Sequence, residues 1–219
     1  TIDKCFNEGK RIFAIVATLG TTVRGAIDPI DIIGRICNER NIWLHIDGSI
    51  GGIFSITNLP ISGIINVNLA NSITINPQKI LGITKTSSLL IVSNIEILNN
   101  TFSTGLPYVS TENNFFNRGE LGIQGSRPAE IIKLWLGLRF LGMRGIEDVL
   151  NSSIERKIFF ENNLDTEKYD IYSGPLHIIS FLPKGMNKNE SDSWTLNKRI
   201  CLLYTSPSPR DVEESGVAG

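Results

Sequence analysis

Two residues in the middle of the chain have side chains that could hold a heterocyclic cofactor. Lys79 follows a β-branched run at residues 72–75 and a turn, and Asp47 ends a second apolar run at residues 42–47. A lysine attacks an aldehyde in its neutral form, which burial favours. An aspartate beside a pyridine nitrogen keeps that nitrogen protonated, so the ring can accept electrons. This pair predicts a pyridoxal 5'-phosphate site, with a Schiff base on Lys79 and Asp47 at the ring nitrogen.

Spacing alone leaves a simpler interpretation open. Asp47 could cap the turn that follows it, and Lys79 could be an ordinary surface lysine. Thr21 and Thr22 follow the first apolar run and offer hydroxyl groups near such a cofactor. They could equally start the turn after that run, and the two roles are compatible.

His45 shares a strand face with Trp43 and Asp47, because side chains alternate along a strand. We include His45 among the catalytic candidates in a supporting role: it would orient Asp47 or the cofactor and would not shuttle protons. Gly51 and Gly52 are expected to allow tight backbone geometry and not to bind phosphate, since no helix N-terminus follows them.

The elements that position these residues can be predicted from the apolar pattern. Residues 12–19 form a continuous apolar run, which suits the interior of a parallel sheet. Asp28 and Pro29 predict the N-cap and first turn of a helix that ends near Asn41. Residues 42–47 follow as a strand and complete a strand–helix–strand unit with an expected right-handed crossover, and residues 72–75 form the third strand. Ligands bind at the carboxyl edge of such sheets, so Thr22, Asp47 and Lys79 should converge there.

The rest of the chain predicts a second, smaller unit. Residues 87–92 indicate a fourth strand, residues 99–125 a polar loop, and residues 128–141 and 146–162 two helices. The first of these helices carries an apolar stripe of Ile131, Leu134, Trp135 and Leu138. Short strands are expected near 169–172 and 178–182. We therefore expect part of a large domain at 1–145 and the start of a small α+β C-terminal domain at 146–200. Residues 201–219 have no apolar period and suggest a non-native tail, a natural disordered tail being the alternative.

Composition excludes several classes of function. The 219 residues are 41% hydrophobic with a net charge of −1, which is typical of a soluble α/β protein and not of a nucleic-acid-binding surface. The apolar runs are far shorter than the roughly 20 residues of a membrane span. Three cysteines without metal-ligand spacing favour a reducing cytoplasmic compartment and no metal site. No Gly-x-Gly-x-x-Gly follows a predicted strand, which argues against a dinucleotide-binding domain.

Several motifs together resemble the group II pyridoxal-phosphate-dependent amino-acid decarboxylases. This family includes the glutamate, aromatic-amino-acid, histidine and cysteine-sulfinate decarboxylases. The resemblance runs from about Lys10 to Leu182. The motifs that carry it are residues 17–22 (ATLGTT), 43–47 (WLHID) with Gly51-Gly52, 76–79 (NPQK), 125–127 (GSR) and 134–136 (LWL).

The resemblance implies an aspartate-aminotransferase-like (fold type I) large domain, which this chain would contain in part. It implies that the substrate is a small-molecule L-amino acid, and it points to a homodimer, with no nucleic acid or membrane involved. It also implies roles for site residues. Lys79 would be the Schiff-base lysine and Asp47 the partner of the ring nitrogen, with Thr22 and Asn76 near the cofactor, Ser49 against its ring and Gln78 by its phosphate. Gly125 and Ser126 would approach the phosphate of the other subunit, and Tyr108 would protonate the carbanion after carbon dioxide leaves.

The chain departs from the family pattern in three places. Gln78 replaces the usual histidine before the lysine, and Asp47-Gly48-Ser49 replaces the usual Asp-Ala-Ala. The chain also begins inside the large domain, so we expect the phosphate loop and the ring-stacking residue to lie outside it. Two alternatives stay open: another fold-type-I enzyme, such as an aminotransferase or a carbon–sulfur lyase, and a non-catalytic fragment.

Overall fold

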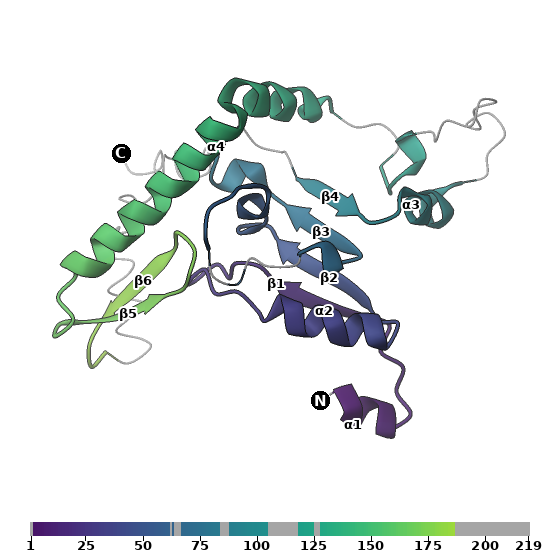
Figure 1. Cartoon of the computed structure of the whole chain (residues 1–219), viewed down its shortest axis with the longest axis horizontal. Helices are drawn as coiled ribbons and strands as arrows, with labels where there is room; N and C mark the ends of the chain where they lie inside the picture. The colour runs from purple at the N-terminus through teal and green to yellow at the C-terminus, as the bar shows by residue number, and fades with distance from the viewer. Residues whose placement is uncertain are drawn as a thin grey trace, which may run out of the picture.

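A four-stranded, mostly parallel sheet forms the centre of the molecule (Figure 1). The computed structural model describes residues 2–61, 63, 67–83, 88–104, 118–124 and 128–186. The strands lie in the order β1 (Ala14–Thr18), β2 (Trp43–Gly48), β3 (Ser72–Ile75) and β4 (Leu89–Val92). The first three are parallel, and β4 pairs with β3 in the antiparallel sense. The mostly parallel sheet predicted from the apolar runs is confirmed.

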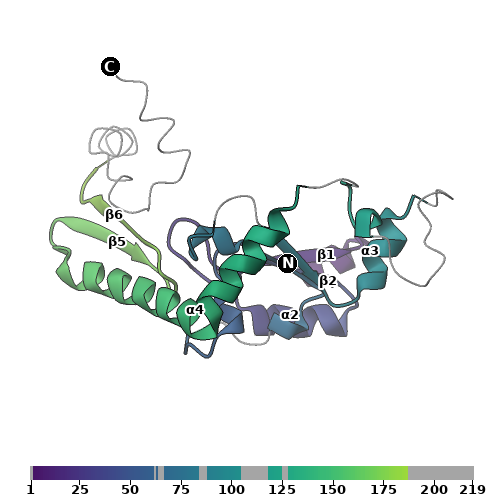
Figure 2. The ribbon, with the colours of Figure 1, turned by 90° about the horizontal axis from the view of Figure 1, so that it is seen from above.

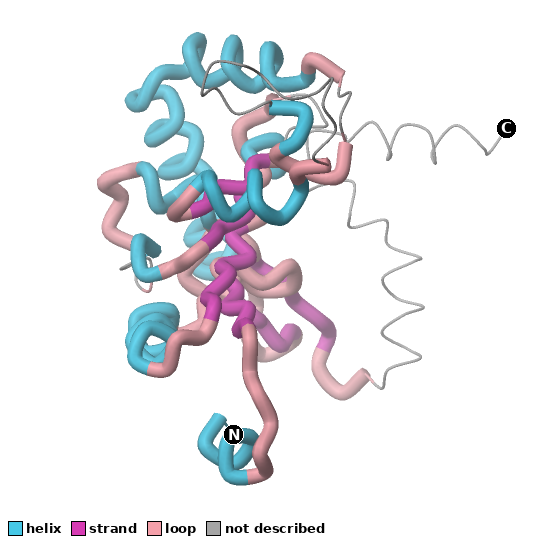
Figure 3. The backbone as a smooth tube through the Cα atoms, turned by 90° about the vertical axis from the view of Figure 1, so that its right-hand side faces the viewer, coloured by secondary structure: helices cyan, strands magenta, loops and turns pink. Residues whose placement is uncertain are grey.

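Helices lie on some sides of these strands, which Figure 3 shows in the middle of the molecule. The α-helices are α1 (Ile2–Asn7), α2 (Ile30–Glu39), α3 (Ile95–Phe102) and α4 (Glu130–Asn163). Short 3-10 helices are η1 (Gly52–Ile56), η2 (Val67–Leu69), η3 (Pro77–Lys79) and η4 (Arg118–Glu120). An antiparallel hairpin of β5 (Tyr169–Ser173) and β6 (Ile179–Pro183) follows α4. This hairpin and α3 lie at opposite ends of the molecule (Figures 1 and 2).

Helix α2 covers one face of the sheet, so the candidate site residues of β2 lie on the other face. Its buried residues Ile30 and Cys37 share a hydrophobic cluster with Leu44 and Ile46 of β2. Since side chains alternate along a strand, His45, which lies between the latter two, points to the opposite face, as does Asp47. Val16, the register partner of His45 on β1, is 63% exposed, so this face is open to solvent at that strand.

The start of α2 differs from the sequence prediction. Asp28 does not cap the helix: one oxygen of its carboxylate accepts a hydrogen bond from the backbone N–H of Thr18 at 2.7 Å. Pro29 takes the N-cap position, and the helix begins without a side-chain cap. Asp28 therefore ties the end of β1 to the following helix, a long-range contact that the local pattern cannot reveal.

Helix α4 contains a sharp break at Gly142, whose φ of 60° and ψ of 178° are not helical. The break separates two helical halves, in agreement with the two helices predicted at 128–141 and 146–162. Within the predicted apolar stripe, Leu134 is buried, whereas Ile131 and Trp135 are more than half exposed. The first half of α4 thus packs on the molecule through only part of its apolar face.

The β5–β6 hairpin packs against the end of β1 and the glycine-rich turn after β2. Leu176, in the connection between the two strands, is fully buried in a cluster with Phe54 and Leu150. An added Cβ at Gly51 would lie 2.5 Å from the carbonyl oxygen of Leu19 and 2.8 Å from Leu176 Cδ1. The turn is therefore held between two packed segments.

Replacing Gly51 with alanine should lower the free energy of unfolding by about 2–4 kcal/mol. The backbone of Gly51 (φ −89°, ψ −14°) suits any residue, so close contact and not conformation requires glycine here. Gly145 in α4 provides a matched control, because its added Cβ would meet Leu141 Cβ at 3.3 Å and alanine favours helix. Denaturant titration of both variants tests the prediction, and equal stability of Gly51→Ala and wild type would contradict it.

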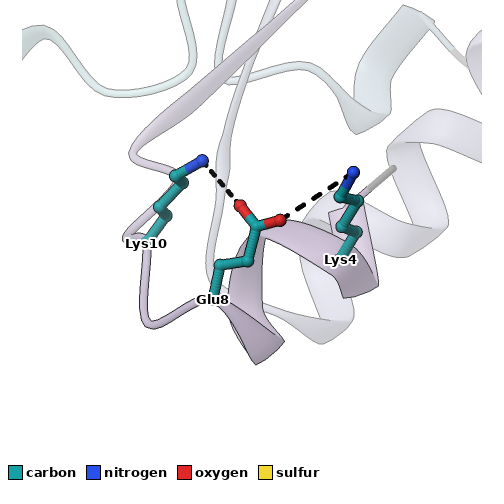
Figure 4. A network of polar contacts seen from close by, with 3 residues as sticks. All are labelled: Lys4, Glu8 and Lys10. Carbon is teal, nitrogen blue, oxygen red and sulfur yellow. Dashed lines mark hydrogen bonds and ion pairs between the residues drawn. The ribbon is translucent and has the colours of Figure 1, made fainter.

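The N-terminal segment carries a small charged network on its surface. Glu8 binds Lys10 at 2.6 Å and lies 3.9 Å from Lys4 (Figure 4). All three side chains are well exposed, so these ion pairs contribute little to stability. In the part of the chain that the structure describes, no helix has the length and apolarity to cross a bilayer.

Candidate functional site

Asp47 lies near the carboxyl end of β2 and is held by the residue two positions further on. Both the backbone N–H and the hydroxyl of Ser49 donate to Asp47 Oδ1, at 3.1 Å and 2.6 Å. The Ser49 hydroxyl bond is the main reason that the pKa of Asp47 lies below its usual range, although partial burial acts in the opposite direction. The site thus contains a stable carboxylate with a fixed orientation.

Lys79 lies at the carboxyl end of the neighbouring strand, β3. Its backbone N–H donates to the carbonyl of Asn76 at 3.0 Å, which closes the short helix η3. Buried Pro77 and Leu81 fix this turn on either side of the lysine, whose own side chain is exposed. The positive charge of Lys79 is close enough to contribute to the lowered pKa of Asp47. The strand ends therefore bring the acid and the amine to one edge of the sheet.

The two threonines after β1 have different environments. Thr21 Oγ1 accepts a hydrogen bond from the backbone N–H of Ala26 at 3.0 Å, so Thr21 closes the turn. Thr22 is exposed at the next position. The register pairs Thr18, at the end of β1, with Asp47, which places this turn near the same edge of the sheet.

His45 is bound by two hydroxyl groups of β3. Its Nδ1 lies 2.8 Å from Ser72 Oγ, and its Nε2 lies 3.2 Å from Thr74 Oγ1. Trp43 Nε1–H donates to the same Ser72 oxygen at 3.0 Å. Neither Ser72 nor Thr74 was predicted to belong to the site. Two polar residues at alternate positions of a mostly apolar strand are the signal that could have identified them.

Gln78 and Asn76 flank the turn that carries Lys79. Gln78 Oε1 is buried and has no hydrogen-bond partner among the described residues, so this amide retains hydrogen-bonding capacity. Asn76 Oδ1 accepts a hydrogen bond from the Ser88 hydroxyl at 2.6 Å, which links η3 to the start of β4. Tyr108, Gly125 and Ser126 lie outside the described residues.

The geometry can be compared with known proteins. A family model described as the pyridoxal-dependent decarboxylase conserved domain matches residues 1–175. The chain belongs to this family. The motifs at residues 17–22, 43–47 and 76–79 fall within the matched range.

The relatives of this decarboxylase-family chain are longer than the chain itself. Acidic amino acid decarboxylase GADL1 of Mus musculus is 28% identical over 213 residues, which cover 94% of this chain and 35% of that protein. Aromatic-L-amino-acid decarboxylase of Bacillus atrophaeus is 29% identical over 151 residues, or 67% of this chain and 32% of that protein. The chain therefore spans about a third of the length of these relatives.

A solved structure supports the fold of this family member. Oryza sativa TDC with PLP and tryptamine aligns with a TM-score of 0.80 at 18% identity, over 92% of this chain and 44% of that one. The prediction that the chain forms part of a fold type I large domain is confirmed.

Gly48 and Ser49, which stand where the family usually has two alanines, each have a local structural reason. A Cβ at Gly48 would lie 2.8 Å from the backbone carbonyl oxygen of Thr74, so alanine there would require β2 and β3 to shift. Ser49 supplies a hydroxyl bond to Asp47 that alanine could not make. In this chain, Gly48 and Ser49 therefore allow close strand packing and hold the carboxylate.

One cavity in the described part of the chain lies away from Asp47 and Lys79. This cavity of about 210 Å³ lies at the opposite end of the strands, where Cys37, Asn41 and Trp43 are among its lining residues. It is distant in the topology from Asp47 and Lys79, which lie at the carboxyl edge. Within the described ranges, no group of three or more His, Cys, Asp or Glu residues could hold a metal ion.

His177 is a second partly buried histidine, in the connection between β5 and β6. Its ring stacks on Phe54, with centroids 5.9 Å apart, and its Nδ1 is buried without a partner among the described residues. Burial lowers the pKa of His177 to about 4 from the ordinary value of 6.5. The folded chain therefore requires an uncharged imidazole where the hairpin packs on η1.

Because of His177, the free energy of unfolding should decrease as the pH is lowered. Between pH 6.5 and 4 the unfolded chain binds a proton that the folded chain excludes. The free energy of unfolding should decrease by about 1.4 kcal/mol per pH unit, or about 3 kcal/mol in all. His177→Phe should remove this dependence while keeping the ring stack on Phe54. Denaturant titrations across this pH range test the prediction, which fails if both proteins show the same pH dependence.

Proposed function

We propose that the protein containing this chain decarboxylates an L-amino acid to the amine and carbon dioxide, using pyridoxal 5'-phosphate bound to Lys79 as a Schiff base. Membership of the decarboxylase family supports the reaction class. The observation that carries the assignment of residues is that Asp47 near the end of β2 and Lys79 just after the neighbouring β3 lie at one edge of the sheet and that their charges interact. Because the chain spans about a third of its relatives, the activity is proposed for the whole protein.

The residues of the site fit this cofactor. Ser49 binds Oδ1 of Asp47, and no described residue donates a hydrogen bond to Oδ2. A lowered pKa keeps the carboxylate negative, so Oδ2 suits a protonated ring nitrogen. The buried, unpartnered Oε1 of Gln78 belongs to an amide whose hydrogen-bonding capacity remains for a ligand beside Lys79.

The site residues have distinct tasks in the proposed reaction. Lys79 would hold the cofactor through its side-chain amine. Asp47 holds a proton at the ring nitrogen, and Tyr108 delivers a proton to Cα. When bound, pyridoxal phosphate supplies the electron sink for the pair released at Cα.

The relatives suggest the first substrates to test. They are named for acidic and aromatic amino acids, so we propose a substrate from one of these two classes. Full-length protein is incubated with carboxyl-labelled L-amino acids of each class, and labelled carbon dioxide and the amine are measured. Release of both supports the proposal. A keto acid without carbon dioxide would instead indicate an aminotransferase, and protein that binds no pyridoxal phosphate would indicate a non-catalytic chain.

We also propose that the full-length protein is a homodimer in which Gly125 and Ser126 approach the phosphate held by the partner. What supports this is the exposed apolar surface on the helix that follows these residues. Ile131 and Trp135 are 62% and 59% exposed, and Phe140 is 90% exposed. Apolar side chains concentrated in this way commonly mark a protein interface. Size-exclusion chromatography with light scattering tests the proposal, and a monomer that binds the cofactor would contradict it.

A further inference from the structure

Four side chains form a continuous hydrogen-bonded row on the open face of β2 and β3. Trp43 and His45 come from β2, and Ser72 and Thr74 come from β3. Ser72 Oγ lies 3.0 Å from Trp43 Nε1 and 2.8 Å from His45 Nδ1. His45 Nε2 lies 3.2 Å from Thr74 Oγ1. Both nitrogens of the imidazole are therefore engaged by hydroxyl groups of the neighbouring strand.

The donor and acceptor roles in this row follow from the chemistry of its first member. An indole N–H can only donate, so Ser72 Oγ accepts from Trp43. Ser72 is only 6% exposed, and a buried hydroxyl proton needs an acceptor. Among the described residues, the acceptor within reach is Nδ1 of His45. If Nδ1 carried the proton instead, the oxygen of Ser72 would accept two hydrogen bonds and its own proton would have none.

We infer that Ser72 is a positioning residue that fixes His45 in the tautomer protonated at Nε2. In this tautomer Nδ1 accepts from Ser72, and Nε2–H donates to Thr74 Oγ1. The inference about the tautomer depends only on hydrogen-bond geometry and burial. Both ring nitrogens are engaged by hydroxyl groups of β3, so His45 would act on Asp47 through Thr74.

The consequence for the site rests on the proposed function. Thr74 is the register partner of Asp47, so the row of hydrogen bonds ends beside the carboxylate. Because Thr74 Oγ1 accepts the hydrogen bond from Nε2–H, His45 has no other N–H to donate to Asp47. Oδ2 of Asp47 then stays available for the ring nitrogen of the cofactor. Loss of Ser72 should therefore weaken the contact between Asp47 and the cofactor without removing either charged group.

Nitrogen NMR of the 219-residue chain labelled with 15N in histidine tests the tautomer directly. The chain has two histidines, so His45→Gln identifies the signals of each. The spectra are recorded at about pH 8, where an ordinary imidazole is neutral. For His45, the tautomer protonated at Nε2 should exceed the tautomer protonated at Nδ1 by more than about tenfold. Ser72→Ala should reduce this excess several-fold. Ser153→Ala is the matched control, because Ser153 is also buried and its hydroxyl binds a backbone carbonyl elsewhere, that of Leu150.

A second variant keeps the test independent of the folding of Ser72→Ala. Trp43→Phe removes the indole donor but leaves the Ser72 hydroxyl with Nδ1 of His45 as its acceptor, so the excess of the form protonated at Nε2 should persist. Wild-type His45 protonated at Nδ1, or loss of the excess of the Nε2-protonated form in Trp43→Phe, would overturn the inference. Failure of the proposed function is recognised separately, because the tautomer is measured without cofactor. If the tautomer is as inferred and full-length protein binds no pyridoxal phosphate, only the proposed function fails.

Discussion

Lys79→Ala in the full-length protein should abolish covalent attachment of the cofactor and lower the decarboxylation rate by about 10³-fold or more. The lysine follows β3 on a turn fixed by buried Pro77 and Leu81, so truncating its exposed side chain should leave the fold intact. The visible absorbance of the bound imine and the rate of carbon dioxide release are measured together.

The control for this variant is Lys184→Ala, which removes an exposed lysine just after β6. It should keep both the absorbance and the rate. An Lys79→Ala protein that retains the imine absorbance would show that another lysine carries the cofactor. Loss of activity with an unfolded circular dichroism spectrum would instead show that the side chain of Lys79 is required for folding.

Asp47→Asn should lower kcat/KM by about 10²-fold or more, because the amide cannot keep the ring nitrogen protonated. Asparagine has the same shape, and its oxygen can still accept both hydrogen bonds from Ser49. The change therefore removes the charge and preserves the local structure. Since the pKa of Asp47 is lowered, the wild-type carboxylate is ionised at neutral pH, and the difference between the two proteins reports that charge.

A matched control is Asp28→Asn, which changes another carboxylate bound to a backbone N–H near the same edge of the sheet. Its oxygen can still accept from Thr18, and it has no role at the cofactor, so kcat/KM should stay within about twofold of the wild type. If Asp47→Asn and Asp28→Asn reduced kcat/KM equally, a general electrostatic effect would explain the loss and the role of Asp47 would be wrong.

The strands could be predicted from sequence because their apolar runs are long and end at polar turns. Residues 42–47 and 72–75 coincide with β2 and β3 to within a residue at each end. The direction of β4 could not be predicted, since an apolar run has the same pattern in either orientation. The role of Asp28 was also beyond prediction, because its partner Thr18 belongs to the preceding strand.

Within the site, the position of a residue was easier to predict than its partners. Asp47 and Lys79 could be placed at one edge because parallel strands end together. The binding of His45 to Ser72 and Thr74 depends on the register between β2 and β3, which the sequence does not specify. The domain boundary at residue 145 remains a prediction, as do the roles of Tyr108, Gly125 and Ser126. The predicted non-native tail at 201–219 lies outside the described residues.

Identification of the lysine that carries the cofactor tests the central claim most directly. Full-length protein is incubated with pyridoxal phosphate, reduced with borohydride to fix the linkage, digested and mapped by mass spectrometry. We expect a stable pyridoxyl group on Lys79, and a weaker yield in Asp47→Asn prepared in the same way. A pyridoxyl group found only on another lysine, or on none, would contradict it.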